Sequence, residues 1–142
     1  MADSLLRALH KRFTSSGLSG IITGGLWTSE VPEGQEPPYA VLEDLGTAYE
    51  HTSQPDARKW LEHSRVVFHV WGRGAEEAED CAESLLDAFA GGGGILEFAG
   101  GTKRCQAVLP HSLTVQSEMV RYRDGTLIYR ASVGFDIRIS KG

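Results

Sequence analysis

Apolar and polar residues alternate along the last part of the chain. Residues 127–139 place one set of side chains on one face and the intervening residues on the other, which is the two-residue period of a β-strand. The run is 13 residues long, whereas a typical strand has about 5–6 residues. Its apolar face consists of Leu127, Tyr129, Ala131, Val133, Phe135, Ile137 and Ile139. The pattern predicts an unusually long strand near the C-terminus.

Other apolar runs predict the rest of a sheet. Residues 39–45 (YAVLEDL) and 64–73 (SRVVFHVWGR) have the composition of strands. The second run is bulky on both faces, so we expect it at the centre of the sheet. Residues 95–98 (ILEF) indicate a short strand, and residues 105–122 indicate one or two strands with a bend or an edge at Pro110. Asp124 and Gly125 are typical of a tight hairpin turn.

Two segments have the helical period instead. Residues 3–15 predict a helix capped by Asp3 or Ser4, and residues 75–89 predict a second helix that ends at the glycine run 91–94. The apolar stripes consist of Leu5, Leu6, Leu9 and Phe13 in the first helix and of Ala78, Ala82, Leu85 and Phe89 in the second.

The order of these elements predicts the fold class. Two helices can cover one face of a mostly antiparallel sheet, which gives an α+β protein of two layers that ends in a long β-hairpin. Residues 46–63, around Pro55, are polar and aperiodic, so we expect them to form a long projecting loop. With 142 residues, the chain should form a single domain over residues 1–142.

Composition excludes several classes of protein. No apolar run approaches the ~20 residues that a membrane helix needs, and residues 1–13 lack the apolar stretch of a signal peptide. Cys81 and Cys105 lie far apart without a CxxC partner, so we expect buried free thiols rather than a disulfide framework or a zinc site. A net charge of −5 argues against nonspecific nucleic-acid binding.

The charge is unevenly distributed along the chain. The segment from residue 103 onward contains seven bases and three acids, and the predicted helix 75–89 contains six acids and no base. These acids are Glu76, Glu77, Glu79, Asp80, Glu83 and Asp87. An acidic helix and a basic C-terminal part can complement each other, either within one subunit or between copies.

No set of residues has the spacing of a catalytic or metal site. The glycine run follows a helix and precedes a strand, which is the reverse of a phosphate-binding loop. His63 and His69 are about 20 Å apart if they lie on one strand, and there is neither an HExxH motif nor a GxSxG elbow. We therefore expect no enzymatic activity, no cofactor and no metal. Trp60 lies in a charged stretch, where it either anchors an interface or folds back onto its own domain.

Taken in order, these segments resemble a known family. The chain looks like the tail completion (tail terminator, or tail-to-head joining) proteins of long-tailed bacteriophages. The resemblance covers nearly the whole length. It rests on LLRALHKRF, PPYAVLE, RVVFHVWGR, AEEAEDCAESLLDAF and the closing YRDGTLIYRASVGFDIRI. The charged stretch 46–63 and the GGGG linker depart from the family pattern.

The resemblance implies a structural protein of the virion, assembled in the host cytoplasm. Such a protein forms a homo-oligomeric, hexameric ring on the head-proximal end of the tail tube, ends its polymerisation and joins it to the head–tail connector. DNA passes through the lumen as cargo, and the ring contacts no membrane. One alternative is a neck or connector ring just above this position, and another is a dimeric ligand-binding or enzymatic α+β domain.

The ring hypothesis gives expectations about individual residues. We expect the acidic helix to face solvent or a basic surface of an adjacent subunit, and the loop 46–63 to contact a neighbouring chain through Trp60. We also expect a lumen that is not strongly basic, because tight phosphate contacts would hold the DNA. The candidate interface residues are Arg58, Lys59, Trp60, Glu76, Glu79, Glu83, Arg121, Arg123, Arg130 and Arg138.

Overall fold

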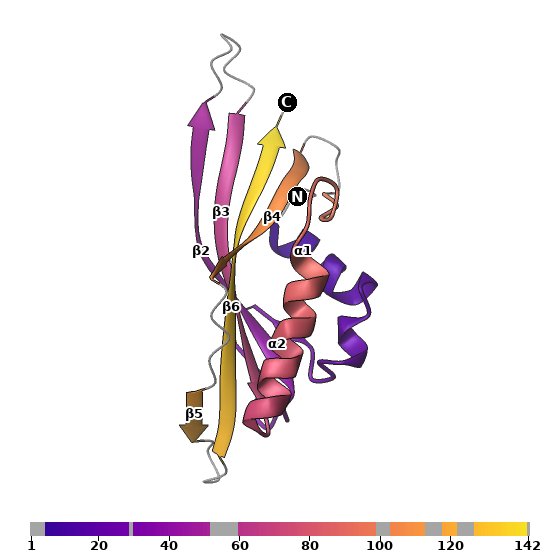
Figure 1. The fold of residues 1–142 in the computed structure, drawn as a ribbon, viewed down its shortest axis with the longest axis vertical. Helices are drawn as coiled ribbons and strands as arrows, with labels where there is room; N and C mark the ends of the chain where they lie inside the picture. The colour runs from indigo at the N-terminus through magenta and orange to yellow at the C-terminus, as the bar shows by residue number, and fades with distance from the viewer. Residues whose placement is uncertain are drawn as a thin grey trace.

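The computed structural model describes residues 5–28, 30–51, 60–98, 103–112, 118–121 and 127–141. Two α-helices, a short 3₁₀-helix and strands of very different lengths make up this part of the chain (Figure 1). In chain order they are α1 (Leu5–Ser15), η1 (Leu18–Gly20), β1 (Leu26–Trp27), β2 (Tyr39–His51), β3 (Trp60–Gly72), α2 (Ala75–Phe89), β4 (Lys103–Ser112), β5 (Glu118–Arg121) and β6 (Leu127–Lys141).

The strands form one sheet in the order β1-β2-β3-β6-β4, and β5 pairs with the N-terminal part of β6. All neighbours are antiparallel except β1 and β2. β3 lies between β2 and β6, which confirms its predicted central place. β6 is the predicted long strand, and it pairs with β3 from Tyr129 opposite Gly72 to Lys141 opposite Trp60.

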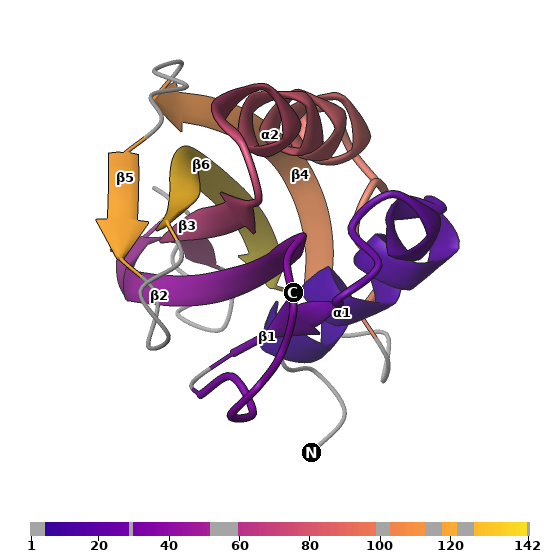
Figure 2. The ribbon, with the colours of Figure 1, turned by 90° about the horizontal axis from the view of Figure 1, so that it is seen from below.

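Both helices pack on the same face of the sheet, which confirms the α+β class (Figures 1 and 2). Phe68 of β3, Phe89 of α2 and Phe135 of β6 meet at the centre of the core, with ring centroids 4.9 to 6.1 Å apart. All three rings are fully buried, and burying a side chain of this kind stabilises the folded chain by about 1.5–3 kcal/mol. The predicted stripes of both helices therefore face the sheet.

Gly72 explains how β3 turns into α2. A Cβ atom at this position would lie 2.7 Å from the backbone nitrogen of Ala78, which is closer than real Cβ atoms approach. The absence of a side chain allows the first turn of α2 to pass directly over the end of the strand.

The predicted loop at residues 46–63 is largely wrong. β2 continues to His51 and β3 begins at Trp60, so most of this stretch belongs to two paired strands, while residues 52–59 lie outside the described part. A bulge between Asp44 and Gly46 interrupts the pairing, and Gly46 provides the positive φ of 119°. Beyond this bulge the strands extend past the helices (Figure 1), and β3 has the buried polar residues Ser64 and Glu62 where a strand of the core would have apolar ones.

Residues 95–98 do not form the predicted strand. Leu96 is buried and Ile95 and Phe98 pack against the core from an irregular segment, so the apolar run reflects burial rather than pairing. The bend predicted at Pro110 coincides with a register shift between Pro110 and Ser112. The predicted caps at residues 3 and 4 and the turn at Asp124 and Gly125 lie outside the described residues.

Candidate functional site: the uncovered face of the sheet and the acidic helix

The face of the sheet opposite the helices is polar and partly aromatic. Near its lower end, Tyr39 of β2 stacks on Trp71 of β3, with centroids 5.4 Å apart and planes inclined by 17°. The Arg130 guanidinium of β6 lies 5.9 Å from the centroid of the Trp71 ring, within range of a cation–π contact. One row above, the His69 ring contacts Glu43 at 3.4 Å and Ser132 at 2.8 Å. Side-chain contacts thus link the three neighbouring strands β2, β3 and β6.

Higher on the same face, three exposed arginines form what we call the arginine patch: Arg65, Arg104 and Arg138. They come from β3, β4 and β6, and the register places all three on the side away from the core. Within the described part of the chain, none of them forms an ion pair. Leu45 (54% exposed) and Leu109 (39% exposed) add apolar surface on this side of the sheet.

A shallow groove of about 430 Å³ adjoins the patch. The small residues Gly46 and Ala48 leave room beside Leu45, and His63 and Arg65 line the β3 side. Asp136 also lines it, and its Oδ1 atom is buried with no hydrogen-bond partner among the residues that the structure describes. An unpaired buried oxygen costs about 1–3 kcal/mol.

The exposed side of α2 is strongly acidic. We call the carboxylates of Glu76, Glu79, Asp80, Glu83 and Asp87 the acidic face, and all five are exposed. Like charges three and four residues apart repel each other by about 0.2–0.5 kcal/mol per pair. No basic residue lies in the last turn of α2, where a positive charge would complement the helix dipole. The predicted outward orientation of the acids is therefore observed, while their role in an interface stays a prediction.

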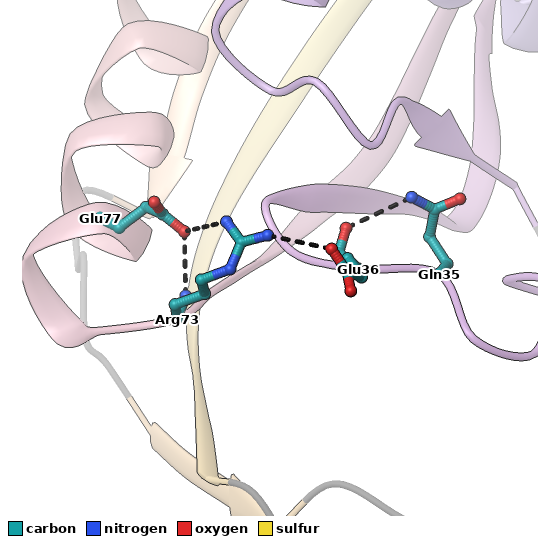
Figure 3. A network of polar contacts seen from close by, with 4 residues as sticks. All are labelled: Gln35, Glu36, Arg73 and Glu77. Carbon is teal, nitrogen blue, oxygen red and sulfur yellow. Dashed lines mark hydrogen bonds and ion pairs between the residues drawn. The ribbon is translucent and has the colours of Figure 1, made fainter.

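Polar contacts hold both ends of α2. At its start, the Arg73 backbone N–H donates to Glu77 Oε1 at 2.9 Å, while the Arg73 side chain reaches Glu77 at 3.9 Å and Glu36 of the proline loop at 3.4 Å (Figure 3). The Gln35 amide donates to the Glu36 carbonyl at 3.3 Å in the same network. At its end, Arg12 of α1 donates from Nε to the Ala88 carbonyl at 2.9 Å. These contacts fix the ends of α2, and with them the acidic face, relative to the proline loop and α1.

A buried ion pair joins two strands on the helix side of the sheet. Lys103 Nζ of β4 lies 3.3 Å from Glu62 Oε1 of β3, and Glu62 is only 5% exposed. Next to it, the Ser64 and Thr47 hydroxyl groups are 2.8 Å apart. This end of the sheet therefore combines buried polar contacts with the apolar side chains of Ile137 and Ile139.

The described residues contain no group of three or more His, Cys, Asp or Glu that could hold a metal ion. Burial raises the pKa of the Cys81 thiol, and the nearby Glu77 and Asp80 carboxylates raise it further. Burial also raises the pKa of the Cys105 thiol, so both stay neutral and poorly nucleophilic near pH 7. Among the helices of the described residues, none is both long and apolar enough to cross a membrane.

The structure places the candidate interface residues in different surroundings. Arg58, Lys59 and Arg123 lie outside the described residues. The Trp60 backbone pairs with His51 and Lys141 at the extended end of the sheet, and Arg121 is the last residue of β5. The other five divide between two faces: Arg130 and Arg138 lie on the uncovered face of the sheet, and Glu76, Glu79 and Glu83 lie on the acidic face of α2.

Sequence reasoning missed Arg65 and Arg104 as part of this surface. Arg65 alternates with the apolar residues of β3, so the two-residue period was a usable signal for its outward position. Arg104 had no such signal, because β4 is interrupted by register shifts and only the fold shows that it shares a face with Arg138.

No protein-family model matches the chain, and a comparison with curated proteins finds no match. Among solved structures, a chain of the virion of a native gene transfer agent particle matches with a TM-score of 0.63 and 16% identity, covering 96% of this chain and 95% of that one. The bacteriophage SPP1 gp17 protein matches with a TM-score of 0.45 and 22% identity over 91% and 88% of the two chains. Over nearly its whole length, the chain thus has the fold of a component of the gene transfer agent virion.

Proposed function

We propose that this chain is a structural ring protein of a phage or phage-like tail. In this role it caps the head-proximal end of the tail tube, ends the polymerisation of the tube and joins it to the head connector. The protein acts by binding other proteins rather than by catalysis, and DNA passes through the ring as cargo.

The observation that carries this proposal is the full-length likeness to a chain of the gene transfer agent virion. A likeness that covers 96% of this chain and 95% of the other includes the extended strands as well as the core. The resemblance of the sequence to tail completion proteins does not depend on the fold. It narrows the proposed role from any component of a virion to a protein at the end of the tail.

The shape of the subunit supports an assembled protein. β2 and β3 extend beyond the two helices (Figure 1). Among the described residues, the outer edge of β2 pairs only with β1, at Ala40 and Val41. Unpaired edges of this length promote aggregation in a monomer but are satisfied in a closed assembly. The resemblance to tail completion proteins implies that this assembly is a hexamer.

The direct test is tail assembly with and without the protein. Tail-tube subunits that polymerise in its absence should give tubes of uncontrolled length. In its presence, tubes should stop growing, and electron microscopy should show an extra ring at one end. The native mass of that ring gives the subunit count. A ring found only on isolated head connectors would favour the neck position instead, and a protein that binds neither tubes nor connectors would refute the proposal.

A further inference from the structure

The arginine patch and the acidic face lie on opposite sides of the subunit. α2 packs on the inner face of β3 and β6, and its five exposed carboxylates point away from the sheet. Arg65, Arg104 and Arg138 lie on the other face of the same sheet. The sheet separates the two surfaces, so they are unable to meet within one copy of the chain (Figure 1).

Most of the charge on both surfaces is unpaired among the residues that the structure describes. The three arginines form no ion pair in the described part of the chain, and the same holds for Glu76, Asp80, Glu83 and Asp87. Among the described residues that line the groove next to the patch, Asp136 is the single carboxylate, and its Oδ1 atom is buried. The patch therefore presents positive charge outward, and the acidic face presents only negative charge.

The surroundings of the patch are those of a protein interface. Leu45 and Leu109 expose apolar surface on the same side of the sheet, and the groove beside Leu45 offers about 430 Å³ for incoming side chains. Arginine is enriched in protein interfaces, and the fully buried centre of an interface is more apolar than the rest of the protein surface. The exposed leucines would contribute little to binding a nucleic acid, which depends mainly on contacts with phosphate groups.

We propose that the arginine patch of one copy of this chain binds the acidic face of α2 on a second copy. The two surfaces differ, so the contact is head-to-tail, and its repetition generates a closed ring or a filament. This inference rests on the proposed function for the expectation of a ring, but the charge complementarity concerns this chain alone.

Charge reversal on each surface tests the contact. One variant carries Arg104→Glu and Arg138→Glu, and the other carries Glu83→Lys and Asp87→Lys. Lysines near the C-terminal end of α2 complement the helix dipole, so the second variant should fold at least as well as the wild type. Each variant alone should self-associate at least about tenfold more weakly, because like charges then face each other at every contact. Arg7→Glu and Glu30→Lys, at exposed positions elsewhere, are the matched controls and should assemble normally.

Mixing the two variants provides the decisive measurement. In a 1:1 mixture, each contact joins either two native surfaces or two reversed ones, and both combinations attract. Sedimentation of the mixture, with and without tail tubes, should return to within about threefold of the wild-type association, with the two variants alternating at equal amounts. Failure of the mixture to recover, when each variant alone is folded and deficient, overturns the inference.

The remaining outcomes distinguish a contact between copies from a patch that binds nucleic acid. If the arginine variant loses affinity for duplex DNA at low salt but assembles normally, the patch binds phosphate groups and the inference is wrong. If the wild type assembles and both variants assemble equally well, only this inference fails. If the wild type stays monomeric with and without tail tubes, the proposed function fails together with it.

Discussion

At the scale of single residues, His10 links α1 to the segment after β1. Its Nε2 atom lies 2.7 Å from the Thr28 hydroxyl, and the ring is half-buried. Burial lowers the pKa of His10, because the charged ring loses water when the chain folds. The unfolded chain therefore takes up a proton at this position more readily than the folded chain does.

This difference predicts a pH-dependent stability. A histidine whose pKa is lower in the folded state stabilises the fold fully above its unfolded pKa of about 6.5, and the contribution is lost as the pH falls below that value. The His10→Gln variant keeps a hydrogen-bonding group but no longer titrates. Between about pH 7.5 and 5.5, the wild type should lose more stability than the variant, by at most about 1.4 kcal/mol per pH unit. Urea unfolding at both pH values measures this, and an equal loss in the two proteins would contradict it.

At the scale of elements, the joint between the two helices depends on one arginine. Near its end at Phe89, α2 has an acid, Asp87, and no base in its last turn, which is unfavourable for the helix dipole. Arg12 of α1 supplies both the missing charge and a hydrogen bond to the Ala88 carbonyl. The C-terminus of α2 is thus completed by a residue 76 positions earlier in the chain.

Replacing Arg12 by methionine should therefore loosen this joint. The variant retains an unbranched apolar stem but loses the donor and the charge, which should lower stability by about 1 kcal/mol. For a domain of this size, that corresponds to a thermal midpoint about 3–4 °C lower. Lys11→Met is the matched control. Lys11 contacts Glu97 at 2.6 Å, but both side chains are exposed, so this change should have little effect. Equal midpoints for the two variants would argue against the capping role.

Elements also show how far the sequence could predict the fold. α1, α2, β3 and β6 have long periodic patterns, because each has one face against the core. The ends of β2 and β3 were not predicted because polar residues occupy buried positions there, so the apolar alternation of a strand is missing. Ser64 bonds Thr47, and Glu62 pairs with Lys103 of β4. The apolar run at residues 95–98 was wrongly predicted as a strand, because an irregular segment can also be buried and apolar.

At the scale of the whole molecule, the candidate interface is a product of topology. The acids of α2 are adjacent in sequence, so their common exposure could be predicted. The arginine patch could not, because Arg65 and Arg104 come from strands that meet only through β6 between them. Surfaces of this kind become visible only when the order of the strands is known.

Trp60 provides a test at this scale. It is the first residue of β3, at the end of the sheet that extends beyond the helices. We predict that Trp60→Ala leaves the thermal midpoint of the monomer nearly unchanged but weakens ring or tail assembly, since losing an aromatic anchor from an interface typically costs about 2 kcal/mol or more. Calorimetry together with a tail-capping assay measures both effects.

Trp27 is a suitable control for this change. Its indole N–H donates to the Gly24 carbonyl at 2.9 Å within the same subunit, so Trp27→Ala should lower the midpoint of the monomer. If Trp60→Ala destabilises the monomer to the same degree, Trp60 contributes to its own domain and the interface hypothesis is wrong.

The position of β6 in the chain has a consequence for synthesis. β6 pairs with β3, β4 and β5, and all three precede it in the sequence. While the chain is being translated, the inner edge of β3 therefore has no partner, and pairings such as Trp60 with Lys141 form only after the last strand has left the ribosome. Late, long-range pairing of this kind slows folding and exposes strand edges meanwhile. An intermediate without β6 thus lacks both the completed sheet and Arg138 of the arginine patch, so we expect the contact between copies to form only after β6 has paired.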